Sequence, residues 1–145
     1  MNNLSNYGEA ELLKVLLAIP GVTLVQNINC FVGLFTQTPG EDNTGEEVAL
    51  TVTTIDGTEP TSYTRQPASF RLFVGTQDEN EANASNVGNI SFNAATAPWG
   101  NIVAVGIYDT VVNGNLLSYF EIDNTIVNTG EIVQFVDRSI ILSLY

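Results

Sequence analysis

The stretch that decides the fold runs from Trp99 to Phe120 and reads WGNIVAVGIYDTVVNGNLLSYF. Its first apolar run is rich in β-branched residues and closes on Asp109, and a second apolar run begins at Leu116. Between the two runs, Asn113-Gly114 supplies residues that tolerate a positive φ. The pattern predicts a β-hairpin whose loop is a few residues longer than the tightest type.

The rest of the chain after the first twenty residues also reads as short strands. Clusters of Gly, Pro, Asn, Asp and Thr separate these runs, as turns do. Three long polar loops are expected at Thr38–Glu47, Asp56–Ser62 and Thr76–Asn86. The predicted fold is mainly β, an antiparallel β-sandwich or jelly-roll-like barrel with one short N-terminal helix. The predicted strands are Val22–Asn27, Asn29–Thr36, Val48–Thr54, Ala68–Val74, Asn89–Asn93, Ile102–Asp109, Leu116–Ile122, Glu131–Val136 and Ser139–Leu144.

The predicted helix lies in an N-terminal segment, residues 1–21, ahead of a single β-sandwich domain, residues 22–145. Ser5 or Asn6 can cap it, and Pro20-Gly21 ends it. Its apolar residues, which include Leu12 and Leu16, crowd more than one face, so it must dock on the sheet or on a neighbouring subunit.

The predicted last strand, Ser139–Leu144, is also apolar on both faces, and Tyr145 extends the second face. These surfaces predict a homotrimer or another cyclic oligomer. Leu12, Leu16 and Tyr145 are therefore candidate interface residues.

Composition excludes several classes of function. The 145 residues contain no histidine and one cysteine, Cys30, which rules out Ser-His-Asp and Cys-His catalysis and His/Cys zinc sites. Cys30 is expected to be a buried apolar residue. The formal net charge of −12 disfavours nucleic-acid binding. No apolar run is long enough to span a membrane, so synthesis in the cytoplasm is expected. The acidic loops lack EF-hand spacing, and no cofactor or metal is predicted.

Carboxylates and arginines remain as candidates for chemistry. Asp109 and Glu121 could form a glycosidase pair, although Asp109 is better explained as a cap of the hairpin turn. Each of Arg65 and Arg71 is expected to meet a carboxylate in so acidic a chain. Arg65 suits either a subunit interface or an ion pair within the domain. Trp99 is expected in the core.

Three motifs in order carry a resemblance to a known family. They are FVGLFT (Phe31–Thr36), YTRQ (Tyr63–Gln66) and the WG…GIYD…GNLL run of the hairpin. Together they resemble small tailed-bacteriophage virion structural proteins, described as capsid decoration (cement) or tail-fibre-like proteins. The link Ala49–Thr61 is longer than is usual in that family.

The resemblance implies a structural protein and no enzyme. Its most direct expectation is a decoration protein that bridges and stabilises major capsid proteins on the head exterior. Attachment would run through the N-terminal segment Met1–Tyr7 and the polar loops. The alternative is a tail-fibre or adhesin module that binds a host surface glycan. Tyr63 and Arg65, in the YTRQ motif, are interface candidates in either case.

Overall fold

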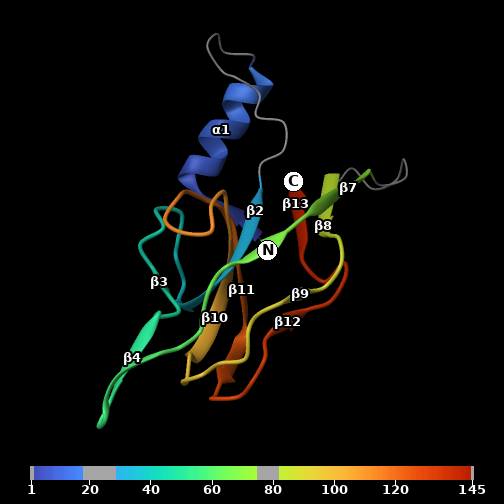
Figure 1. Ribbon diagram of the computed structural model, residues 1–145. Coiled ribbons are helices and arrows are strands. Elements are labelled where there is room, and N and C mark those ends of the chain that lie inside the picture. Colours follow the sequence, from blue (N-terminus) through green and yellow to red (C-terminus); the bar gives the residue numbers. More distant parts are fainter. Residues whose placement is uncertain (1, 18–28, 75–81, 145) are drawn as a thin grey trace.

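The computed structural model describes residues 2–17, 29–74 and 82–144. A six-stranded antiparallel sheet forms its centre, with the order β1-β11-β10-β2-β3 and with β6 also paired to β2 (Figure 1). The bounds of its strands are β1 (Asn2–Leu4), β2 (Cys30–Gln37), β3 (Glu46–Glu47), β6 (Gln66–Ala68), β10 (Gly100–Tyr108) and β11 (Leu116–Val127).

Smaller antiparallel sheets complete the β structure. β8 lies between β7 and β13 in a three-stranded sheet, while β9 pairs with β12 and β4 with β5. The described strands form open sheets and no closed barrel, which confirms the sandwich form of the predicted fold. Their bounds are β4 (Thr51–Thr54), β5 (Gly57–Pro60), β7 (Phe70–Val74), β8 (Ala82–Asn86), β9 (Ile90–Ser91), β12 (Gln134–Phe135) and β13 (Ile141–Leu144).

The predicted hairpin supplies two neighbouring inner strands of the central sheet. β10 and β11 pair antiparallel, with Gly106 opposite Tyr119, and β2 pairs with the other edge of β10. Asn113 and Gly114 have φ values of 55° and 74°, as the turn requires. The prediction from this stretch is confirmed.

Hydrophobic residues cover both faces of the central sheet. The larger cluster includes Val32, Leu34 and Val105 and continues into Phe92 and Ile140 of the second layer. A smaller cluster on the opposite face contains Phe35, Tyr108 and Tyr119, among others. The alternation of β2 explains this split, because successive side chains of a strand point to opposite faces.

The helix α1 (Asn6–Leu16) begins at the predicted place. The Ser5 side chain caps it by accepting a hydrogen bond from Gly8 N at 3.0 Å, and it donates in turn to the Leu116 carbonyl. Just before the helix, β1 pairs with β11, so Asn2–Leu4 belongs to the sheet. These residues therefore do not project from the protein, contrary to the expectation that Met1–Tyr7 serves as an attachment segment. No helix within the described residues has the length and apolar character that crossing a membrane requires.

Several predicted boundaries are wrong. The expected polar loops contain β3, β5 and β8, which sequence patterning missed because their residues are polar or small and do not alternate. β8 reads ANASN and owes its conformation to pairing with apolar strands on both sides. The predicted strand Val22–Asn27 and the helix end at Pro20-Gly21 lie outside the described residues.

Replacing Ser5 by Ala tests the joint between α1 and the sheet. The change removes the helix cap and the hydrogen bond to Leu116, so the free energy of unfolding should fall by about 1–2 kcal/mol. Urea denaturation followed by circular dichroism measures this. Ser91→Ala, at an exposed position, is the control and should change the free energy of unfolding by less than about 0.5 kcal/mol. Equal effects of the two changes would contradict the capping role.

Candidate interaction site

The YTRQ motif converges on Glu47, an acid that sequence analysis did not single out. Arg65 binds its carboxylate with two parallel hydrogen bonds, Nε to Oε1 at 2.9 Å and Nη2 to Oε2 at 2.8 Å. Tyr63 donates its hydroxyl to the same Oε1 at 2.6 Å. The side chains of Arg65 and Glu47 are only 10% and 24% exposed, so water screens this ion pair weakly.

The remaining contacts of Arg65 hold the hairpin loop. Its Nη1 donates to the carbonyls of Thr110 at 3.1 Å and Asn113 at 2.6 Å. Its guanidinium carbon lies 3.4 Å from the centre of the Tyr108 ring, a cation–π contact. Arg65 thus joins β3 to the loop between β10 and β11, and most of its hydrogen-bonding capacity is used within the chain.

Tyr63 links the same carboxylate to the core. Its hydroxyl accepts a hydrogen bond from Leu34 N at 2.8 Å, and its ring packs edge-on against Trp99. Trp99 is buried, as predicted, and its indole N–H donates to the Thr61 carbonyl at 2.8 Å. Gly33 of the FVGLFT motif leaves room for the carboxylate, since a Cβ there would lie 2.9 Å from Glu47 Oε1. The three motifs of the sequence therefore meet at one place.

The environment of Glu47 shifts the ionisation of its neighbours. Burial raises the pKa of Tyr63 far above its usual range, and the charge of Glu47 raises it further. Burial and Glu47 also raise the pKa of Tyr108 to about 12, against the lowering effect of Arg65. Burial lowers the pKa of Arg65, but its bonds to Glu47 outweigh this and raise it overall. The cluster is a fixed array of a carboxylate, a guanidinium and neutral phenols.

The predicted interface residues differ in burial and in contacts. Arg65 forms the intradomain ion pair that was one of its two interpretations, and Tyr63 is 6% exposed. Leu12 is half-buried. The side chain of Leu16 and all of Tyr145 lie outside the description. A role for these residues in a subunit interface stays a prediction.

The carboxylate pair considered for glycoside hydrolysis is not assembled. Asp109 accepts from Asn115 N at 2.7 Å and from its side-chain amide at 2.9 Å, and so caps the hairpin loop. Glu121 pairs with Ala104, five positions before Asp109 on β10. That offset corresponds to roughly 16 Å along a strand, which exceeds the separation of glycosidase carboxylates. No group of His, Cys, Asp and Glu in the described parts of the chain could hold a metal ion.

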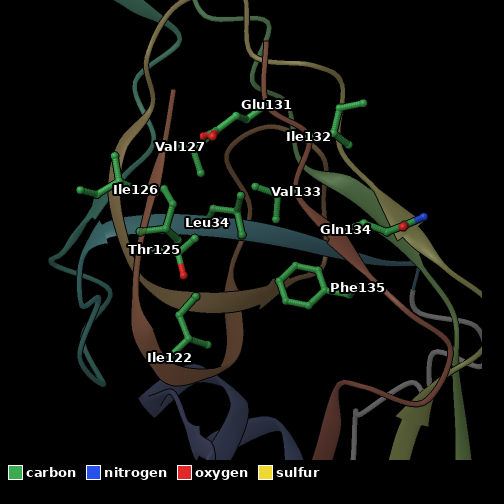
Figure 2. Close-up of a pocket in the computed structure, with 11 residues that line it drawn as sticks. Leu34, Ile122, Thr125, Ile126, Val127, Glu131, Ile132, Val133, Gln134 and Phe135 are labelled. Atoms are coloured by element: carbon green, nitrogen blue, oxygen red, sulfur yellow. The ribbon is translucent and has the colours of Figure 1, made fainter. Parts of the chain in front are cut away.

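An apolar groove lies beside the second half of β11. It has a volume of about 520 Å³ and a mainly apolar lining. Figure 2 shows Val133 and Phe135 directed toward Leu34 at its floor, with Ile132 and Gln134 directed away. Ile126 and Ile132 are exposed at the rim. No sequence signal predicts this groove, because it forms between β11 and a segment with only two residues in a strand.

Other apolar side chains face outward at a distance from the groove. Leu13 of α1 and Leu17, directly after the helix, are exposed. The hairpin of β4 and β5 projects from the body of the protein, and the side chain of Ile55 at its tip is fully exposed (Figure 1). Leu50 at its base is also exposed. Exposed apolar side chains on a projecting element are typical of contact surfaces.

Replacing Arg65 by Met should lower the free energy of unfolding by about 2–4 kcal/mol, because it strands a poorly solvated carboxylate. Arg71→Met is a matched control, because Arg71 is exposed and has no carboxylate partner among the described residues. That Arg71 meets a carboxylate stays a prediction, since residues 75–81 lie outside the description. The control should change stability by less than about 0.5 kcal/mol. Urea unfolding of both variants measures the difference, and equal losses would contradict the assigned role of Arg65.

Alkaline pH should destabilise the protein through Tyr63 and Tyr108. Both pKa values are raised on folding, so the unfolded state loses these protons first. The stabilisation is complete below about pH 10 and declines above it, by up to about 1.4 kcal/mol per pH unit for each tyrosine. Urea midpoints between pH 8 and pH 11.5 measure the slope. Tyr108→Phe should make it shallower, and an unchanged slope in this variant would refute the assignment.

Comparison with known proteins agrees with the motif resemblance. The family model described as podophage GP4 fiber I protein gp80 matches residues 3–143. No curated protein matches the chain. The matched region contains Glu47, Arg65 and all three motifs that meet there. The chain therefore belongs to the family of the podophage GP4 fiber I protein gp80, a family of phage virion structural proteins.

Proposed function

We propose that this chain is a structural subunit of the fibre apparatus of a podophage virion. The match to a fibre protein family over residues 3–143 carries the proposal, because it spans nearly all of the described structure. A module grafted onto an unrelated body would match over only part of the chain. The family description thus applies to the fold as a whole.

The use of the motif residues supports a structural role without catalysis. Glu47, Arg65 and Tyr63 bond to one another and to the backbone, which leaves little capacity for a substrate. Asp109 is engaged as a turn cap. The sequence motifs that carry the resemblance therefore build the scaffold, and the function is left to the exposed surface.

The projecting hairpin is the surface that best fits self-assembly. β4 and β5 form a two-stranded sheet of their own, which is marginally stable in water without further packing. The fully exposed side chain of Ile55 at the tip adds no hydrophobic stabilisation to the isolated chain. The hairpin also lies in the link Ala49–Thr61, which the motif resemblance marks as longer than usual. We assign it to contacts between copies of this chain in a cyclic oligomer, a trimer in the simplest case.

Sedimentation velocity of the purified chain tests this assembly. The wild-type protein should sediment as an oligomer at micromolar concentration. Ile55→Asp should sediment as a monomer with an unchanged circular dichroism spectrum, because it places a charge in the contact and disturbs no core residue. Thr53→Asp, on an exposed position of the same hairpin, controls for added charge. A wild-type monomer, or an Ile55→Asp oligomer, would contradict the proposal.

Capsid decoration is a second candidate, favoured by the acidity of the chain. A net charge of −12 suits the outside of a head better than a surface that faces packed DNA. In this role the major capsid protein would be the partner, and the chain would be present in hundreds of copies.

Electron microscopy of virions labelled with an antibody against this chain distinguishes the two sites. Label confined to the tail region, with few copies per particle, is the result expected for a fibre subunit. Label over the whole head, with hundreds of copies by gel densitometry, would refute the fibre assignment and support decoration.

A further inference from the structure

A small hollow opens on the outward face of the three-stranded sheet. Phe70 and Leu142 of this sheet pack on the core, so the alternate residues Arg71 and Ile141 face outward. The hollow has a volume of about 70 Å³, and its lining brings together two of the four basic residues of the chain. The lining residues are Arg71, Ser85, Asn86, Val87, Asp137 and Arg138.

Arg71 is placed beside Ser85 by the sheet register. The two residues are direct partners across β7 and β8, and Ile141 of β13 lies opposite Ser85 on the other side. Arg71 is exposed, and among the described residues neither a carboxylate nor a carbonyl accepts a hydrogen bond from it. Within the described parts of the chain Arg71 therefore lacks an acidic partner, although the chain has sixteen acids.

Ser85 supplies an independent observation at the same place. The residue is 3% exposed, and its hydroxyl oxygen is buried with no hydrogen-bond partner among the described residues. Buried hydroxyls are nearly always paired, because an unpaired one destabilises the folded state. A ligand in the hollow would give this hydroxyl an acceptor.

Arg138 and Asp137 are the other charged residues among those that line the hollow. Asp137 is held by Gly88 N, which donates to its Oδ1 at 2.7 Å. Its other oxygen lies 3.7 Å from Arg138 Nε, too far for a strong hydrogen bond. Of the described residues that line the hollow, two are cations and one is an anion, so their summed charge is positive, whereas that of the whole chain is strongly negative.

We propose that this hollow binds a small oxyanion, a carboxylate or phosphate group, through Arg71 and the Ser85 hydroxyl, with Arg138 adding positive charge. Arginine and hydroxyl donors are the groups that recognise such anions. A volume of about 70 Å³ holds roughly two water molecules, so only the anionic group itself fits, without a sugar ring or an aromatic ring.

Titration of the full chain with sodium acetate and with sodium phosphate tests the site. Thermal unfolding and the NMR signals of the arginine Nε–H groups serve as readouts, against sodium chloride at equal ionic strength. At least one oxyanion should give a saturable response that chloride does not. Acetate acting at lower concentration identifies a carboxylate site, and phosphate acting at lower concentration identifies a phosphate site.

Variants locate the response in the hollow. Arg71→Gln should weaken oxyanion binding about tenfold, because it removes a charge-assisted hydrogen bond. Asp137→Asn should strengthen binding, because it removes the opposing charge while keeping an oxygen for Gly88 N. Ser85→Ala should lose most of the response, yet unfold in chloride at the wild-type temperature or above, because an unpaired hydroxyl is gone. Ser91→Ala should behave like wild type.

The proposal fails under either of two results. Responses to acetate and phosphate that match chloride would show that only ionic strength acts on the protein. An oxyanion response that is unchanged in Arg71→Gln would place the binding elsewhere and leave the hollow to water alone.

Discussion

The bidentate ion pair between Arg65 and Glu47 is the contact on which the rest of the arrangement depends. It joins β3 to the segment before β6, and through the Thr110 and Asn113 carbonyls it reaches the loop of the central hairpin. The Tyr63 hydroxyl extends the same network to the backbone of β2. Pairs of this kind add little net stability over a hydrophobic substitute, but losing one partner is costly. The network therefore fixes which segments meet, more than it adds stability.

The buried network forms the scaffold of the protein, and the exposed surface is left for its function. The residues of the three motifs lie in the interior, where they are bonded to one another and to the backbone, and the outer surface carries few basic side chains. The proposed assembly through the exposed apolar side chain of the hairpin needs no pocket. The hollow at Arg71 adds a place where charge could direct a contact, since the chain is otherwise strongly acidic.

Sequence patterning predicted the parts of the fold that depend on local signals. β10, β11 and β2 alternate or run apolar over many residues, and Ser5 stands at the start of a clear helix, so these elements were found. β8 and β5 were missed because polar strands are specified by the partner to which they pair. Glu47 could not be assigned from sequence either. It lies in an acidic loop with three other acids, and only the three-dimensional position of Arg65 selects it. The hollow at Arg71 could not be predicted from the sequence either, because it depends on the pairing of β7 with β8.

A double-mutant cycle on Glu47→Gln and Arg65→Met tests the central claim most directly. The free energies of unfolding of the wild type, both single variants and the double variant give the coupling energy of the pair. If the ion pair organises the meeting of the three motifs, the double variant should be more stable than the sum of the single losses predicts, by about 1.5–3 kcal/mol. A coupling energy below about 0.5 kcal/mol would show that the two side chains act independently and would contradict the account.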